Sequence, residues 1–191
     1  MIQDFILSRG GARARIARRG AELRQWQCHG QDLIWSGAPE IWPQTAPILF
    51  PIVGWARNGR ILVDGVHYPI SVHGFAASET FKPIDHGADH LHLRLDHSPK
   101  TLIHYPFAFA LHVLYRLEEE SLRVTLQVEN GSDQVMPYAC GLHPGFVWPF
   151  IGGRREDHRI EFGAEEEPLV PRIAEGGLFS PHSHPIPLRG R

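Results

Sequence analysis

The stretch from Phe107 to Leu117 reads FAFALHVLYRL, and its apolar side chains recur at every second residue. Alternate side chains on a β-strand point to opposite faces, so this run predicts a strand with one buried face. The runs from His90 to Asp96 and from Leu122 to Val128 alternate in the same way, and Asn130-Gly131 then marks a turn. Three such runs predict a large antiparallel sheet with one solvated face.

More strands are expected on the N-terminal side of this sheet. Turn signals stand at Arg9-Gly10-Gly11, His29-Gly30 and Asp64-Gly65, between runs rich in β-forming residues. The first two turns join the predicted strands Ile2–Ser8, Ala12–Ala17, Ala21–Cys28 and Asp32–Trp35. Helical periodicity is scarce, so the expected fold class is all-β, a large antiparallel β-sandwich.

The chain changes character after Pro149. His158 to Phe162 is predicted to form a short strand, whereas the Pro- and Gly-rich tail from Gly176 to Arg191 is predicted to contain no closing strand. The end at Arg191 therefore reads as an interruption, and the sandwich is expected to be incomplete at its C-terminus.

Size and charge exclude several classes of function. The 191 residues suffice for one domain with a real core, and a net charge of −2 with a pI of about 6.7 gives no basic field for nucleic acid. No apolar run is long enough to span a bilayer, and residues 1–5 do not resemble a signal peptide. Cys28 and Cys140 are not spaced as a disulfide framework or a zinc site, so a cytoplasmic protein is expected.

Thirteen histidines raise the question of a metal. The candidates are His90-x-His92, which Asp96 follows at four residues, and His182-x-His184 in the tail. No glycine stands ahead of the first pair at the cupin spacing, and the pair lies on the polar face of a predicted strand. Solvated strand histidines are the better interpretation, and no bound metal is expected.

Another kind of site is predicted at GLHPGFVWP, residues 141–149. Pro144 holds His143 in extended geometry, and Phe146 and Trp148 lie two residues apart on one face. This arrangement suits an acid–base imidazole beside a sugar ring, although a turn histidine that ends a strand over the core is the simpler alternative. His73 lies in a similar glycine- and aromatic-flanked turn.

The segment from Gly37 to Gly59 is predicted to be an ordered loop packed over one sheet face. Its aromatic residues, with the preceding Trp35, are candidate sugar-stacking platforms, and the alternative is that they cover the core: Trp35, Trp42, Phe50 and Trp55.

A set of motifs in the same order and spacing resembles the aldose 1-epimerases (galactose mutarotases), especially their LacX-like branch. The motifs are APILFPIVG at 46–54, Asp64-Gly65 with Tyr68-Pro69, HGFA at 73–76, Tyr105-Pro106-Phe107 and GLHPGF at 141–146. The resemblance covers nearly the whole chain. It implies the galactose mutarotase-like supersandwich, with residues 1–191 as a single domain that forms the N-terminal two-thirds of the family fold.

The resemblance also implies an activity. The family interconverts α and β anomers of a free aldose by opening the ring, without a metal or cofactor, and the implied substrate is an aldohexose. By resemblance His143 is the general acid and His73 is the partner that helps at the ring oxygen. The implied substrate-binding residues are Arg60, Arg57 as a substitute for it, Asn58, Phe75 and Trp148.

Departures from the family pattern keep three hypotheses open. Trp55 and Ala77 stand where the branch usually has basic residues, which argues against a sugar phosphate. The family's base glutamate and a sugar-binding aspartate belong to a C-terminal portion that this chain is expected to lack. The chain is therefore an isomerase, a non-catalytic carbohydrate-binding module, or a truncated remnant whose open sheet edges favour self-association.

Overall fold

The computed structural model describes residues 4–150, 152–164, 169–174 and 178–185. One antiparallel sheet is a meander with the order β1-β2-β3-β4. Its strands are β1 (Asp4–Arg9), β2 (Ala12–Ala17), β3 (Leu23–Cys28) and β4 (Gln31–Asp32). The predicted meander is confirmed, but β3 begins two residues later than expected, after left-handed turn residues at Gly20 and Ala21. The fourth strand ends at Asp32 instead of Trp35, and Ile34 makes only an isolated bridge to Phe146.

The second antiparallel sheet has the order β11-β10-β9-β8. Its strands are β8 (Lys82–His86), β9 (His90–Asp96), β10 (Phe109–Leu117) and β11 (Leu122–Asn130). The alternating runs of the sequence therefore do form the predicted sheet. β10 starts at Phe109 instead of Phe107, although the Phe107 side chain is still buried.

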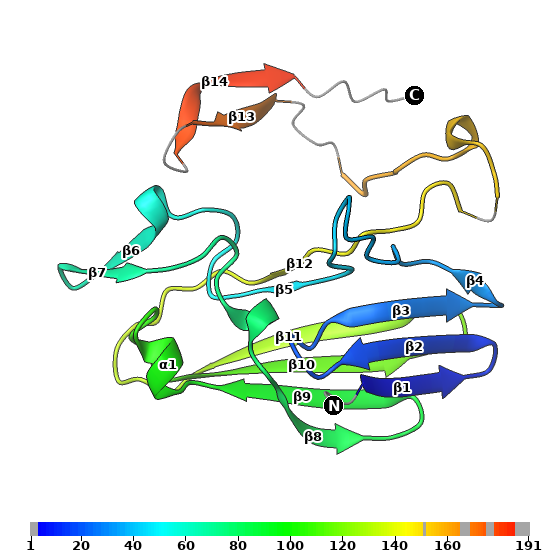
Figure 1. The fold of residues 1–191 in the computed structure, drawn as a ribbon, viewed down its shortest axis with the longest axis horizontal. Coiled ribbons are helices and arrows are strands. Elements are labelled where there is room, and N and C mark those ends of the chain that lie inside the picture. Colours follow the sequence, from blue (N-terminus) through cyan, green and yellow to red (C-terminus); the bar gives the residue numbers. More distant parts are fainter. Residues whose placement is uncertain (1–3, 151, 165–168, 175–177, 186–191) are drawn as a thin grey trace.

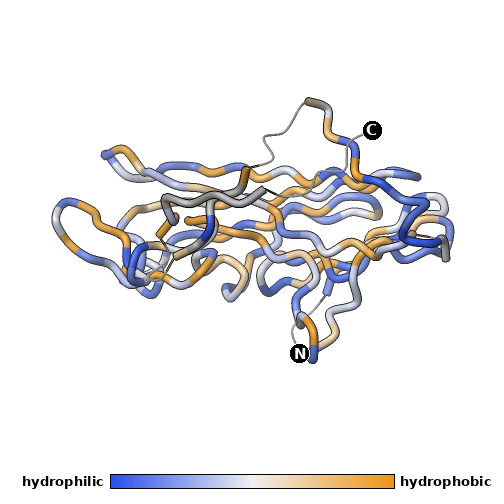
Figure 2. Tube along the Cα trace, turned by 90° about the horizontal axis from the view of Figure 1, so that it is seen from above, coloured by the Kyte–Doolittle hydropathy of each residue, from blue (hydrophilic) through white to orange (hydrophobic). Residues whose placement is uncertain are grey.

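The two sheets pack face to face around one core. β1 contacts β9 and β10, and β2 contacts β10, although none of these strand pairs is hydrogen-bonded. Figure 1 shows β1 to β3 lying over β9 to β11. The core joins residues of both sheets, among them Leu7, Ile16, Leu93, Leu111 and Val113, each fully buried. Hydrophobic and hydrophilic segments alternate along the strands in Figure 2, as a two-layer sandwich requires.

Shorter elements cover one end of this sandwich. β5 (Ile48–Leu49) pairs with β12 (Gly141–Leu142), and β6 (Arg60–Val63) forms a hairpin with β7 (Val66–Pro69) at the Asp64-Gly65 turn that the sequence predicts. The helical turns are η1 (Arg57–Gly59), η2 (Ala76–Ser78), α1 (Pro99–Leu102) and η3 (Arg155–Asp157). None of the helices in the described ranges is long and apolar enough to cross a membrane.

The structure corrects two predictions for the C-terminal part. Residues 158–162 are irregular instead of a strand. The tail does contain a strand, because β13 (Leu169–Ile173) pairs with β14 (Phe179–Pro185), but these two strands form a separate sheet and neither of them closes the sandwich. The prolines in both strands made this hairpin hard to predict, since proline weakens the strand signal.

Candidate functional site

His73 and Gly74 form a left-handed turn that is tied to the chain just after β5. Their φ angles are +63° and +77°. The Phe50 N–H donates to the His73 carbonyl at 3.2 Å, and the Phe75 N–H donates to the Phe50 carbonyl at 3.0 Å. A Cβ atom on Gly74 would lie 2.1 Å from the Phe50 carbonyl oxygen, so only glycine fits there. This close approach sets the position of His73.

The His73 imidazole is held in one tautomer by the backbone. The Gly54 N–H donates to His73 Nδ1 at 3.0 Å. Nδ1 must therefore be unprotonated, and the neutral ring carries its hydrogen on Nε2. Burial of the ring lowers the pKa of His73, and the charge on nearby His143 lowers it further. His73 is thus a neutral hydrogen-bond donor with a fixed orientation.

His143 lies directly after β12, beside His73. Its N–H donates to the Pro47 carbonyl at 3.2 Å, which anchors this turn to the chain before β5. The ring centroids of His143 and His73 are 5.8 Å apart, and the Trp42 ring lies 5.3 Å from His143 on another side. A Cβ atom on Gly145 would meet the Trp42 ring at 2.8 Å, so this glycine makes room for the tryptophan. His143 itself is exposed.

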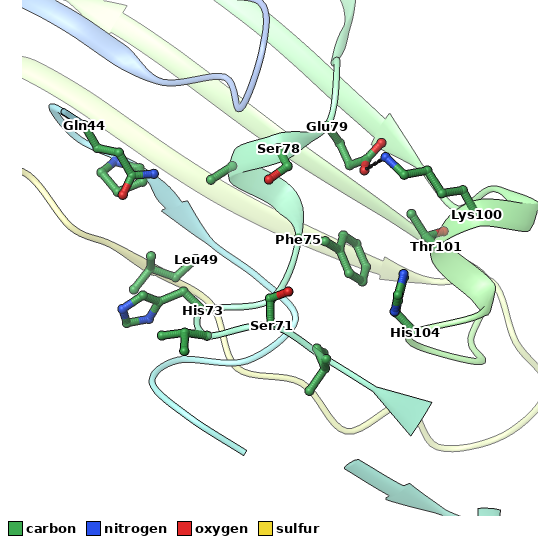
Figure 3. A pocket seen from close by; sticks show the side chains of 15 residues that line it. Gln44, Leu49, Ser71, His73, Phe75, Ser78, Glu79, Lys100, Thr101 and His104 are labelled. Atoms are coloured by element: carbon green, nitrogen blue, oxygen red, sulfur yellow. Dashed lines mark hydrogen bonds and ion pairs between the residues drawn. The ribbon is translucent and has the colours of Figure 1, made fainter. Parts of the chain in front are cut away.

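A cavity of about 300 Å³ opens next to His73 (Figure 3). Its walls come from the chain around β5, from residues 70–79 and from α1 with the residues that follow it. Gln44, Ser71 and Ser78 bring polar groups to its wall, and Phe75 brings an aromatic ring. Polar and apolar residues share this wall about equally, and the volume is at the lower end of the range for small-ligand sites.

The end of the cavity remote from His73 holds charged residues that the sequence analysis missed. Lys100 pairs with Glu79 at 2.5 Å, and Figure 3 shows this pair at the cavity wall. His104 Nδ1 donates to the Pro69 carbonyl at 2.8 Å. Ser98 caps α1 and so positions Lys100. No local motif marks these residues; the one signal was the neighbouring Tyr105-Pro106-Phe107.

The other expected substrate-binding residues do not gather around this cavity, except Phe75. The Phe75 ring lines the cavity and also packs 5.9 Å from the Phe109 ring in the core. Arg57 and Asn58 lie in η1 and Arg60 begins β6, all three exposed and outside the cavity lining. Their expected role in sugar binding stays a prediction.

Trp148 lies in a different hollow. Its ring meets the His158 ring edge to face, with the centroids 5.2 Å apart, and it lines an open depression together with Trp35, Arg24 and Arg15. Its expected contact with the sugar also stays a prediction. Among the candidate stacking platforms, Phe50 is fully buried in the core and Trp42 contacts His143.

The structure describes the side chains of only one of the two candidate metal pairs, His90 and His92. In the described ranges, no group of three or more His, Cys, Asp or Glu residues is arranged to hold a metal ion. His92 Nε2 instead lies 2.7 Å from His112 Nδ1, so these two rings are hydrogen-bonded to each other. The side chains of His182 and His184 lie outside the described part of the structure.

The chain is similar to known proteins along most of its length. A family model described as aldose 1-epimerase matches residues 3–181. Two curated relatives from Lactococcus lactis subsp. lactis, the plasmid and chromosomal forms of protein LacX, are each 33% identical over 158 residues. The match covers 78% of this chain and 53% of each relative, so the chain spans about half the length of these relatives.

Solved structures agree with this assignment. The galactose mutarotase related enzyme from Lactobacillus acidophilus superposes with a TM-score of 0.77 and 32% identity, over 80% of this chain and 51% of that one. A galactose mutarotase-like protein from Lactobacillus casei gives a TM-score of 0.73 with 32% identity, over 75% and 50%. A galactose mutarotase-like protein from Clostridium acetobutylicum, 17% identical, shares the fold over 97% of this chain and 64% of its own, with a TM-score of 0.73.

Proposed function

The chain belongs to the aldose 1-epimerase family, and from this premise we propose that it interconverts the α and β anomers of a free aldohexose. The observation that carries the proposal is the pairing of His73, which lines the cavity, with His143, whose ring lies beside that of His73 but outside the cavity lining. The two imidazoles differ in their surroundings: one is fixed and neutral, and the other is exposed. That difference suits two separate roles at one sugar oxygen.

His143 is proposed as the general acid. Its exposed ring has no hydrogen bond or ion pair to another side chain in the described residues, so it is free to exchange a proton. Transfer of that proton to the ring oxygen breaks the C1–O bond while the anomeric hydroxyl gives up its proton to a base. The product is the open-chain aldehyde. Rotation about C1–C2 and closure on the other face return the proton to His143.

His73 is proposed as the neutral donor that holds the ring oxygen. Its Nε2–H is available because Nδ1 is occupied by the Gly54 N–H. A neutral donor stabilises charge that develops on the oxygen without a second positive charge beside His143. The lowered pKa of His73 keeps it in this neutral form when His143 is protonated. Phe75 is proposed to supply the apolar wall for the sugar.

The decisive experiment follows mutarotation of freshly dissolved α-D-glucose and α-D-galactose by polarimetry. The wild-type chain is expected to exceed the buffer rate, and His143→Ala is expected to lose about 10²- to 10⁴-fold of that excess. His67→Ala, an exposed histidine on β7, is the matched control and is expected to keep full activity. A wild-type rate equal to the buffer blank would exclude the isomerase.

One observation favours a second candidate, a carbohydrate-binding module without turnover. The one carboxylate in the described lining of the cavity is that of Glu79, which lies at the end remote from His73 and pairs with Lys100, and no carboxylate among the described residues contacts the imidazole of His73 or His143. This candidate predicts saturable sugar-induced shifts in the NMR signals of the cavity residues, with no gain in rate. Isomerase activity predicts both the shifts and the rate.

A further inference from the structure

β11 is a long strand with one open edge. In the ranges that the structure describes, β10 is the one strand that pairs with β11. The strand carries no proline and no lysine, and Val124, Thr125 and Val128 are residues of high β-propensity. An edge of this kind offers a row of free backbone N–H and C=O groups to another strand.

The opposite edge of the same sheet is protected. β8 carries Lys82 and Pro83, and its register with β9 shifts between Pro83 and Asp85. An edge lysine, an edge proline and an irregular register are all features that prevent strand addition. β4, at one edge of the other sheet, has two residues. β11 differs from these edges because it is nine residues long, has no lysine or proline, and keeps a regular register with β10.

The hydrogen-bond pattern shows which residues of β11 face the open edge. The Glu118 N–H donates to the Ser121 carbonyl and the Gly131 N–H to the Ala108 carbonyl, both at 2.8 Å and both in the β10–β11 register. Every second residue of an antiparallel strand bonds to the same neighbour. The odd-numbered residues of β11 thus bond to β10, and the open edge presents the backbone of Leu122, Val124, Leu126, Val128 and Asn130.

The side chains of β11 are self-complementary in one antiparallel register. If two copies of β11 pair with Leu126 opposite Leu126, all residues from Leu122 to Asn130 are paired and the open backbone groups face one another. Arg123 then stands opposite Glu129, Val124 opposite Val128, and Thr125 opposite Gln127. Arg123 and Glu129 occupy non-hydrogen-bonded positions, where opposed side chains come closest.

The charges within one copy leave this pairing available. Arg123 is exposed and makes no hydrogen bond or ion pair among the described residues, and its neighbour across the β10–β11 ladder is another cation, Arg116. The Glu129 side chain is 48% exposed; its Oε1 lies 3.4 Å from Gln127 Nε2 and from His112 Nε2. A second copy would supply Arg123 with the acidic partner that its own sheet lacks.

We propose that β11 pairs with β11 of a second copy, antiparallel and centred on Leu126, which joins the two sheets into one continuous sheet across a two-fold axis. This interface is independent of the sugar site. It buries the long unprotected edge and makes two Arg123–Glu129 ion pairs, one on each side of the axis.

Charge exchange tests the proposal by sedimentation velocity over a range of concentrations. Wild type is expected to dimerise. Arg123→Glu and Glu129→Arg each place like charges opposite one another twice, and each is expected to weaken the dimer by about tenfold or more. The double variant restores opposite charges and is expected to regain dimerisation. Lys82→Glu on the protected edge is the control and is expected to change nothing.

Cysteine pairs test the register. A mixture of Thr125→Cys and Gln127→Cys chains is expected to form a cross-linked dimer under mild oxidation, whereas neither variant cross-links by itself. Wild type, with Cys28 and Cys140, gives the background. A chain that stays monomeric up to about 1 mM, a dimer that both charge reversals leave intact, or cross-linking of Thr125→Cys alone would each overturn the proposal. The first result would leave the edge to a strand of a different polypeptide.

Discussion

His73 Nδ1 accepts a hydrogen bond of 3.0 Å from the backbone N–H of Gly54, and this contact decides what His73 is able to do. A protonated Nδ1 would point its own hydrogen at the Gly54 N–H and could not accept this hydrogen bond. The neutral tautomer is therefore favoured, in the same direction as burial and the nearby His143 charge. His73 and His143 are neighbours with different proton chemistry, and that difference is the basis of the roles proposed for them.

The lowered pKa of His73 predicts how stability depends on pH. Below pH 6.5 the unfolded chain binds a proton at His73 that the folded chain resists, so the free energy of unfolding falls as the pH drops through 6.5 toward the folded pKa. The Oδ1 atom of Asn stands near the position of Nδ1, and Asn tolerates a left-handed φ. We therefore expect the free energy of unfolding, measured with urea, to fall less steeply between pH 7 and 5 in His73→Asn than in wild type.

His92 has to be considered as a background in that measurement, because burial and His112 lower its pKa as well. The comparison of wild type with His73→Asn cancels this contribution. An NMR titration of His73 with a midpoint at or above pH 6.5 would contradict the interpretation.

Gly74 is predicted to be the least replaceable glycine of the site. Alanine there would combine a φ of +77° with a Cβ atom 2.1 Å from the Phe50 carbonyl oxygen. We expect Gly74→Ala to cost about 3 kcal/mol of unfolding free energy, or to prevent folding. Gly65→Ala is the control, because it has a φ of +78° with no atom within 4 Å of the added Cβ. It should cost about 1 kcal/mol, and equal losses for the two variants would argue against the clash.

Much of the fold was predictable because β1, β2, β9 and β11 alternate between a more buried and a more exposed face, and because β10, which is buried on both faces over Phe109 to Val113, has an alternating run of apolar residues. The period-two pattern is then strong, and the predicted strand His90–Asp96 has the bounds of β9. The pattern failed where a strand is not half-buried in this way. All five residues of β8 are exposed, and prolines interrupt β13 and β14, so none of these strands was expected.

The candidate site was predictable to the extent that local sequence marks it. His73 precedes a glycine, His143 precedes Pro144-Gly145, and the structure brings their rings together. Lys100 and Glu79 carry no such mark. They meet because Glu79, which directly follows η2 and precedes β8, and Lys100 in α1, between β9 and β10, are brought together by the tertiary fold.

Glu22 is predicted to hold the His143 turn in place through the core. Its buried carboxylate accepts from the Thr45 N–H at 2.7 Å, from the Thr45 hydroxyl at 2.9 Å and from the Ala46 N–H at 3.1 Å. The Thr45 carbonyl in turn accepts from the Gly145 N–H at 2.8 Å. We expect Glu22→Ala to cost about 3 kcal/mol, because it leaves buried donors unsatisfied.

The control for Glu22 is Arg24→Ala, which removes the half-exposed ion-pair partner at 2.9 Å but leaves the buried hydrogen bonds intact. It should cost about 1 kcal/mol in the same urea experiment. A larger loss for Arg24→Ala than for Glu22→Ala would show that the ion pair matters more than the buried hydrogen bonds.

Lys100 is predicted to affect sugar binding more than the chemical step. It lies at the end of the cavity remote from His73, and its amine pairs with the Glu79 carboxylate at the wall. A residue that contacts only the far part of a substrate stabilises the ground state and the transition state equally, which changes KM and leaves kcat unaltered. We expect Lys100→Met to raise KM for mutarotation by about five- to tenfold, equivalent to ~1 kcal/mol.

His143→Ala is the comparison for this prediction, because it should lower kcat instead. Because the Lys100 side chain is 67% exposed, its variant should unfold at nearly the same urea concentration as wild type. A fall in kcat with KM unchanged would place Lys100 at the reacting atoms and contradict the assignment of the His73 end as the reaction centre.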